Sequence, residues 1–385
     1  MKRAYRAEFR APKEEGWALL ILRTDPSRDR PVAEGVPPSA KVDSPKAALR
    51  SDASEGRNSS SDRGIAPPSE PDAARDDGPP PIPLPSPFER STVVCADRVW
   101  RTTRPASALR IGCQSHRGPP WTWVDKCNQD FAFALEYVDR ARNPWALVGV
   151  CDGVGTSTWS ERAAQHAARA FLEVVASELD QEVELAAAMQ RAQNKQDFAK
   201  AFHARARQLL EEDASLLYAD RYIPPDWKRQ YYTKEFLSGP KAAEKRREWL
   251  QSTLLAAALG PKGGFALLIG DGFLRLDRHR KGEPVARKVV PLQTDEQEPE
   301  RRVSLLMTSD DVLEGIRGIL PEQSTCIEVL LATDGVSKSP RNGLGDVTFG
   351  DSAECTAFLE ALAGRPPGEV ESDNMSVAFA ARSLA

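Results

Sequence analysis

Hydrophobic residues after about residue 93 fall into short runs separated by polar turns, a pattern typical of a globular domain. Continuous apolar runs of this length indicate buried strands, whereas apolar residues three or four apart indicate helices. Strands are predicted at 145–150, 264–269, 273–277, 303–308, 327–333 and 374–380, and helices at 160–179, 198–214 and 240–259. Because the helices lie between two groups of strands, the order favours an α+β sandwich over strict βαβ alternation.

The N-terminal part of the chain has a different composition. Residues 31–90 contain 13 of the 30 prolines, and little in them can be buried. Such a segment cannot offset its ordering entropy, so we expect residues 1–92 to be largely disordered, apart from a strand near 16–22. The run Pro79–Pro87 favours a polyproline conformation, which we interpret as a spacer rather than as a ligand for a proline-binding module. The globular domain would then span 93–385, with a helical insertion at about 195–250.

The composition excludes several classes of protein. Hydrophobic residues make up 41% and charged residues 28% of the 385 residues, and the net charge of −4 creates no strong attraction to nucleic acid or membranes. The apolar runs are too short to span a bilayer, and the charged N-terminus lacks the apolar core of a signal peptide. The six scattered cysteines form no CxxC pair, which indicates free thiols. We therefore expect a cytoplasmic protein.

Acidic residues stand at the ends of several predicted strands, namely Asp130, Asp152, Asp271, Asp334 and Asp373. A single Asp-Gly is more often a hairpin turn than a functional site. Five carboxylates at strand ends instead predict a sheet edge whose gathered negative charge needs a cation. Ligands that are all oxygen suit magnesium or manganese, and the four histidines form no pattern that favours zinc.

The motifs around these residues have a specific order: NQD at 128–130, CDGVG at 151–155, GDG at 270–272, LLATDGV at 330–336 and DNMSVA at 373–378. This series resembles the metal-dependent protein phosphatase family, also called type 2C, and its bacterial branch in particular. The resemblance covers roughly residues 95–385. It implies a four-layer α-β-β-α sandwich with two central antiparallel sheets, and a hydrolase with two metal ions at one end of the sheets.

The resemblance also implies roles for single residues. Asp152 would bridge both ions, and the carbonyl of Gly153 would bind one of them. Asp334 and Asp373 would hold the other ion, and Asp130 would ligate metal or orient a metal-bound water. A water bridging two Mn²⁺ or Mg²⁺ ions would attack the phosphorus of phosphoserine or phosphothreonine in line. The catalytic residues that the resemblance implies are Asp152, Asp130 and Lys126, the last as a positive charge near the substrate phosphate.

The chain departs from the family pattern at several positions. Asp125 stands where many members have a phosphate-binding arginine, and Lys126 beside it would supply a point charge instead. Gln129 replaces a common glutamate. A metal-bound water would protonate the leaving group. His116 is an outside candidate for that task, although we interpret it as a partly exposed loop histidine. Lys338 stands where members with a third metal have an aspartate, so its ammonium would occupy that place and the third site would be weak or absent.

Three functions follow from these patterns. The main prediction is a protein serine/threonine phosphatase of bacterial signalling, monomeric, without nucleic acid or membrane partners. Its partners would be phosphorylated proteins, specifically a serine/threonine kinase or its substrates. The departures at Asp125, Gln129 and Lys338 motivate the alternative of a catalytically weak pseudophosphatase that binds a phosphoprotein or another partner. A hydrolase of small phosphoesters, with the 195–250 insertion as its lid, is the third possibility.

Overall fold

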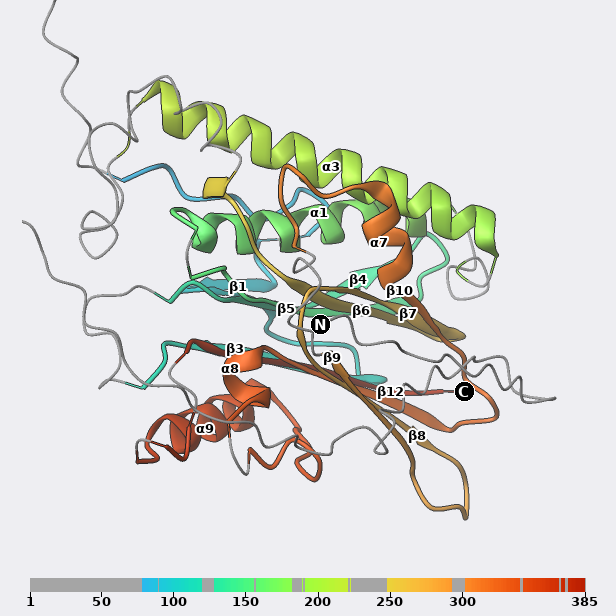
Figure 1. The fold of residues 1–385 in the computed structure, drawn as a ribbon. Coiled ribbons are helices and arrows are strands. Elements are labelled where there is room, and N and C mark those ends of the chain that lie inside the picture. The colour runs from blue at the N-terminus through green and yellow to red at the C-terminus, as the bar shows by residue number, and fades with distance from the viewer. Residues whose placement is uncertain are drawn as a thin grey trace, which may run out of the picture. The chain divides into compact units, whose positions relative to one another are not determined.

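The computed structural model describes residues 78–88, 90–119, 128–155, 157–181, 189, 191–220, 222, 248–292, 302–339, 342–366, 368–370 and 373–384. Within these residues two sheets stack on each other, with long helices over the outer face of one and a shorter helix over the outer face of the other (Figure 1). This arrangement confirms the predicted α-β-β-α sandwich. The strand predicted near 16–22 lies outside the described residues, as do Asp125 and Lys126.

The first sheet has seven strands, in the order β1-β2-β4-β5-β6-β7-β10. Their bounds are β1 (Val93–Ala96), β2 (Val99–Thr102), β4 (Phe131–Val138), β5 (Pro144–Cys151), β6 (Leu254–Gly260), β7 (Gly263–Ile269) and β10 (Ile316–Ile319). The pairing of β2 with β4 is parallel, and the other pairings in this sheet are antiparallel. The prediction of antiparallel sheets is therefore wrong at this one pair.

The second sheet has five strands in the order β3-β12-β11-β8-β9, all paired antiparallel. Their bounds are β3 (Leu109–His116), β8 (Gly272–His279), β9 (Ala286–Leu292), β11 (Cys326–Ala332) and β12 (Met375–Ser383). The chain crosses from the first sheet to the second between β7 and β8, through Gly270 and Asp271. The GDG motif is thus a crossover between sheets and not a hairpin within one sheet.

The described helices are α1 (Ser160–Asp180), α3 (Ala192–Ala219), α7 (Ser309–Gly315), α8 (Asp334–Ser337) and α9 (Ser352–Ala363). Buried side chains form three clusters: one between α1, α3 and the first sheet, one between the two sheets, and one between the second sheet and α9. Each layer thus buries apolar surface against the next one. No helix in the described part of the chain is both long and apolar enough to cross a bilayer.

Two predicted elements are wrong. The alanine-rich end of the predicted helix 240–259 is instead β6, whose residues are all buried between β5 and β7. A short apolar run is compatible with either a helix or a buried strand. Here tertiary packing overrides the helix propensity of alanine. In place of the predicted strand 303–308, the chain forms one isolated bridge, between Val303 and Ser252. The chain then turns, and Thr308 caps the N-terminus of α7.

The proline-rich run packs against the first helix layer instead of acting as a free spacer. Ile82, Leu84 and Phe88 are buried in the cluster around α1. Arg162 donates to the carbonyl of Pro80 (2.8 Å) and Gln165 to that of Ile82 (3.1 Å). The apolar residues among the prolines therefore anchor residues 78–88. The domain boundary at residue 92 and the 195–250 insertion stay predictions.

Candidate metal centre

The strand pairing brings the predicted acidic residues to one end of both sheets. Phe131 pairs with Cys151, so Asp130 before β4 and Asp152 after β5 lie at the same end of the first sheet. In the second sheet, Asp334 follows β11 and Asp373 precedes β12, two antiparallel neighbours. Because antiparallel strands place the start of one beside the end of the next, these carboxylates gather at one edge.

Two glycines allow the loops that carry these carboxylates to approach each other. A Cβ on Gly153 would lie 2.5 Å from the carbonyl oxygen of Gln129, next to Asp130. A Cβ on Gly335 would overlap the carbonyl oxygen of Asn374 and press on Asp373. Close backbone contacts across the site therefore require glycine directly after Asp152 and directly after Asp334.

Thr333 connects the carboxylates of the two sheets. Its hydroxyl donates to Asp130 Oδ2 (3.0 Å) and accepts from the backbone N–H of Ser376 on β12 (2.9 Å). Asp130 is fully buried, and Arg98 braces its backbone by donating to its carbonyl oxygen (2.7 Å). The Asp130 carboxylate is therefore held in one orientation at the junction of the sheets.

The carboxylates repel one another strongly. Burial, together with the charges of Asp373 and Asp334, raises the pKa of Asp130 to about 7. Desolvation and the charges of Asp130, Asp334 and Asp373 raise the pKa of Asp152 well above its ordinary value. All four predicted aspartates thus act on one another, and like charges held so close favour the binding of cations.

A fifth carboxylate and an ammonium complete the cluster. Oxygen atoms of Asp152, Asp271 and Asp334 lie within 4.8 Å of one another. Lys338 Nζ lies 2.7 Å from Asp334 Oδ2 and 3.2 Å from Asp271 Oδ2. Although desolvation lowers the pKa of Lys338, its hydrogen bond to Asp334 and the nearby charges raise it above the ordinary value. Lys338 thus carries a fixed positive charge inside the cluster.

The donor set fits hard divalent cations. Asp130 Oδ1 and Asp334 Oδ1 are buried and accept no hydrogen bond among the described residues. Buried carboxylate oxygens without a donor are costly unless a cation binds them. The ligands offered here are carboxylate and carbonyl oxygens, which magnesium and manganese prefer. The site therefore fits the metal ions that the sequence predicts.

Other residues singled out from the sequence lie differently. Lys126 and Asp125 are outside the described residues, so their placement stays a prediction. Gln129 is buried, and its amide donates to Ser160 Oγ at the start of α1. The imidazole of His116 contacts the carbonyl of its neighbour Arg117, at the end of β3 that pairs with the start of β12. No contact of His116 with the acidic residues is found in the described part of the chain.

Sequence reasoning did not identify Thr333 or Arg98 as parts of this site. Thr333 lies inside the LLATDGV motif, so its position beside Asp334 was available as a signal. Arg98 precedes β2 and reaches Asp130 only through the parallel pairing of β2 with β4.

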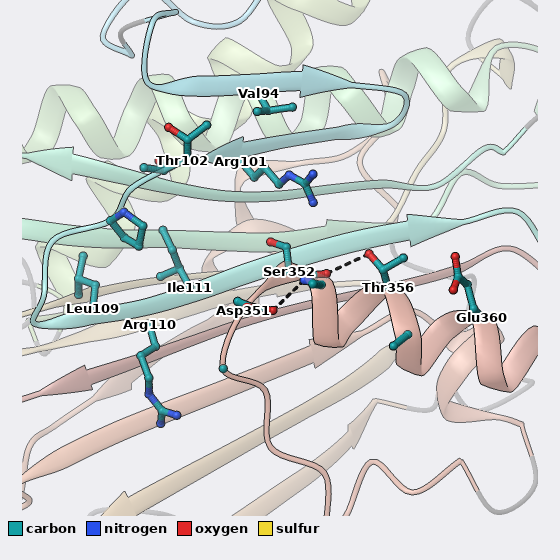
Figure 2. Close-up of a pocket in the computed structure, with 15 residues that line it drawn as sticks. Val94, Arg101, Thr102, Leu109, Arg110, Ile111, Asp351, Ser352, Thr356 and Glu360 are labelled. Carbon is teal, nitrogen blue, oxygen red and sulfur yellow. Dashed lines mark hydrogen bonds between the residues drawn. The ribbon is translucent and has the colours of Figure 1, made fainter.

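A separate pocket of about 630 Å³ lies between the β1–β2 hairpin, β3 and the start of α9 (Figure 2). Val94, Arg101 and Thr102 line it from the hairpin, and Ser352 and Thr356 from α9. Its β3 residues pair with the end of β12, far from the Asp373 end of that strand. Its lining includes none of the clustered aspartates, so we assign it no part in the metal centre.

The chain is similar to known proteins in two of the comparisons made. The model of the protein phosphatase 2C family matches residues 118–368. Among solved structures, the catalytic domain of the serine/threonine phosphatase PstP with two manganese ions is 18% identical (TM-score 0.41), and 72% of this chain and 99% of that chain are covered. PstP/Ppp of Mycobacterium tuberculosis is 20% identical (TM-score 0.41), with the same coverage of 72% and 99%. PppA of Pseudomonas aeruginosa is 16% identical (TM-score 0.40), again with 72% and 99% covered.

A search of curated protein sequences gave no match. The two stacked sheets carry a cluster of strand-end carboxylates that suits divalent cations. Since the family model spans most of the globular part, the chain belongs to the protein phosphatase 2C family. It is thus a hydrolase of the phosphoprotein phosphatase class, as the motif series predicts.

Proposed function

We propose that this chain hydrolyses phosphoserine and phosphothreonine in proteins, at the cluster of Asp130, Asp152, Asp334 and Asp373. The observation that carries the proposal is the convergence of these carboxylates, whose charges together raise the pKa of Asp152. The binding of divalent cations stabilises such a cluster, because the cations relieve the repulsion between the carboxylates. Membership of the family supports the same reaction.

Two Mn²⁺ or Mg²⁺ ions are the cofactors in this proposal. Asp152 would be shared between them, with the Gly153 carbonyl on one ion, Asp334 and Asp373 on the other, and Asp130 as a ligand or as the group that orients water. When bound, the two cations would lower the pKa of a water between them and neutralise charge on the phosphoryl oxygens.

The chain itself holds Asp152 and Asp130 in place through hydrogen bonds. Thr253 accepts from the backbone N–H of Asp152 through its hydroxyl (3.0 Å) and donates its own N–H to the Asp152 carbonyl (2.8 Å). Ser252 Oγ also donates to that carbonyl (2.8 Å). Thr333 holds Asp130 from the other sheet (3.0 Å). These contacts hold the backbone of Asp152 and the carboxylate of Asp130 before any substrate arrives, which reduces the reorganisation needed during the reaction.

Lys338 replaces a further cation in this proposal. Its ammonium already bridges Asp271 and Asp334, so a third divalent ion beside Asp271 would have to displace it. We therefore propose that two ions, not three, suffice for this chain. Lys126 stays the sequence-based candidate for a second positive charge near the substrate.

The test is turnover of a phosphothreonine peptide by the purified full chain, with manganese and with EDTA, beside Asp152→Asn and Asp139→Asn. Asp139 is the matched control, because it lies at the other end of the β4–β5 hairpin and binds Asn143 and Trp145. We expect manganese-dependent turnover that Asp152→Asn abolishes and Asp139→Asn retains.

Two other outcomes would redirect the proposal. Manganese binding by calorimetry without turnover of several phosphopeptides would favour the pseudophosphatase. Turnover of p-nitrophenyl phosphate but of no phosphopeptide would favour a hydrolase of small phosphoesters. Phosphorylated proteins are the proposed substrates, with a serine/threonine kinase or its substrates as the specific partner. The monomeric state and the cytoplasmic location also stay predictions.

A further inference from the structure

Arg98 occupies the two-residue turn between β1 and β2, beside the metal centre. Val99 pairs in parallel with Ala132, which places Arg98 one position from Asp130. The backbone of Arg98 has a φ of 61°, in the left-handed region that a residue with a side chain rarely adopts. Its carbonyl accepts from the N–H of Ala132 (3.0 Å). The pairing with β4 thus maintains an unfavourable backbone conformation directly beside Asp130.

The guanidinium of Arg98 joins two further segments of the chain. Its Nε donates to the carbonyl oxygen of Asp130 (2.7 Å). Its Nη2 donates to the carbonyl of Gln129 (3.1 Å) and to that of Glu161 in the first turn of α1 (2.7 Å). The guanidinium carbon also lies 5.4 Å from the centroid of the Phe131 ring. The planar fork of donors therefore clamps the backbone of the NQD motif between the hairpin and α1.

Both carbonyls of this motif belong to residues that support proposed metal ligands. Asp130 is itself a proposed ligand, and Thr333 holds its carboxylate from the other sheet (3.0 Å). The Gln129 carbonyl lies against Gly153, where a Cβ would approach it to 2.5 Å. A displacement of the backbone at 129–130 would therefore move the Asp130 carboxylate. It would also disturb the contact that seats Gly153, whose carbonyl is another proposed ligand.

We propose that Arg98 is a positioning residue of the metal centre, which sets the affinity for Mn²⁺ by fixing the backbone of Gln129 and Asp130. Residues that orient metal ligands in this way typically change metal affinity or activity by about 10- to 100-fold. The family model begins at residue 118, so the β1–β2 hairpin precedes the matched residues and is nevertheless part of the functional unit. This inference rests on the proposed function, in which Mn²⁺ or Mg²⁺ is the cofactor.

A role as a clamp and a role as a charge predict opposite signs. A guanidinium near a cation site repels the cation, so the removal of a charge alone would strengthen manganese binding. The removal of the clamp loosens Asp130 and weakens manganese binding. Arg98→Met keeps an unbranched side chain without donors, whereas Arg98→Lys keeps the charge without the planar fork.

The experiment measures manganese binding to the metal-free full chain by calorimetry, for wild type, Arg98→Met, Arg98→Lys and Arg142→Met. Arg142 is the matched control, because it also has a left-handed backbone (φ 65°) and lies in the β4–β5 turn, at the opposite end of β4. Urea unfolding in EDTA reports whether each variant folds. Hydrogen exchange of the metal-free protein over 128–132 reports how firmly the motif is held. The kcat and KM for p-nitrophenyl phosphate are measured afterwards at saturating manganese.

We expect the manganese dissociation constant to rise by about ten-fold or more in Arg98→Met. The rise should be smaller in Arg98→Lys and absent in Arg142→Met. Amide exchange over 128–132 should be faster in Arg98→Met before any metal is added, because the clamp on these carbonyls is lost. At saturating manganese the kcat should fall and the KM should stay unchanged, because Arg98 acts through Asp130 and not on the substrate.

The outcomes separate the two proposals. If the wild type binds no manganese, the proposed function fails and the role of Arg98 fails with it. If the wild type binds manganese but hydrolyses no phosphopeptide, the proposed function fails, while weaker manganese binding in Arg98→Met still supports the role of Arg98. Equal or stronger manganese binding in Arg98→Met overturns only the role of Arg98. If Arg98→Met does not fold, Arg98→Lys decides: weaker manganese binding supports the role, and wild-type affinity overturns it.

Discussion

Lys338 Nζ lies 2.7 Å from Asp334 Oδ2, so the aspartate that follows β11 carries its own counter-ion four residues later. The other oxygen of the same carboxylate, Oδ1, is buried without a hydrogen-bond donor among the described residues. The two oxygens of the Asp334 carboxylate therefore differ. Oδ2 contacts the ammonium of Lys338, whereas Oδ1 can still serve as a ligand for a cation. We therefore expect Lys338 to limit how many cations the cluster can accept.

Replacing Lys338 by Met should strengthen manganese binding. The substitution keeps much of the side-chain volume but removes a charge that repels cations and occupies oxygens of Asp334 and Asp271. Unit charges about 4 Å apart interact by several kcal/mol at protein surfaces, so a gain of roughly ten-fold in affinity, or an additional bound ion, is a conservative expectation. Isothermal calorimetry of the apo protein measures both quantities.

Lys200→Met on the exposed face of α3 is the control for general loss of positive charge. It should leave affinity and stoichiometry unchanged. Equal or weaker manganese binding in Lys338→Met would show that Lys338 does not compete with metal.

Thr333→Val should loosen the junction of the two sheets. Valine has nearly the same shape but can neither donate to Asp130 nor accept from Ser376. Leaving these buried groups without partners should lower the free energy of unfolding by about 1–3 kcal/mol. Manganese affinity should fall as well, because Asp130 loses its fixed orientation. Urea denaturation and calorimetry test the two effects.

Thr356→Val is the matched control, since its hydroxyl only donates to the carbonyl of Ser352 within α9. It should change the free energy of unfolding by no more than about 0.5 kcal/mol. Equal effects of the two substitutions would argue against a special role of Thr333.

The strand-end carboxylates could be predicted from sequence because each follows or precedes a short apolar run. In a sandwich of antiparallel strands, such ends meet at a common edge. Asp130, Asp152, Asp334 and Asp373 were found in this way, and the structure brings them together. Local pattern and global fold agree at these positions.

The parts that could not be predicted depend on contacts between distant segments. Leu254–Gly260 has a composition that suits helix and buried strand equally, and only its place between β5 and β7 decides. Val303 lies beside Ser252 through an isolated bridge that no local sequence pattern indicates. Ile82 and Leu84 were too few among the prolines to indicate packing, although α1 buries both.

Gly335→Ala should damage both stability and metal binding. The added methyl group would overlap the carbonyl oxygen of Asn374, and backbone on both sides leaves little room to adjust. Overpacking of this kind costs about 1–3 kcal/mol. Gly335 lies where the loop of Asp334 contacts the loop of Asp373. The substitution should therefore also raise the dissociation constant for manganese. Thermal unfolding with and without manganese measures both effects.

Gly345→Ala provides the comparison, because a Cβ at that position would meet no atom of the described residues within 4 Å. Its effect on unfolding should stay within about 0.5 kcal/mol. Wild-type manganese affinity in Gly335→Ala would contradict the close approach of the two loops.

Asp213→Asn should weaken the contact of α1 with α3 in a pH-dependent manner. Asp213 is buried and accepts from Arg162 Nε (2.7 Å) and Nη2 (2.6 Å), with His166 Nε2 at 3.2 Å. Against the opposing effect of burial, these partners lower the pKa of Asp213 to about 2. Removing the charge leaves the largely buried guanidinium of Arg162 without its paired carboxylate, which costs about 3 kcal/mol near neutral pH.

The sign of the pH dependence follows from the lowered pKa. The stabilisation by Asp213 is fully present above the unfolded pKa of about 3.9 and is lost as the pH falls toward 2. The difference in urea midpoint between wild type and Asp213→Asn should therefore shrink as the pH falls below 4. Glu211→Gln, in an exposed pair with Arg207, should change stability by less than about 0.5 kcal/mol. A difference that does not change down to pH 2.5 would show that the Asp213 charge contributes nothing to the contact of the two helices.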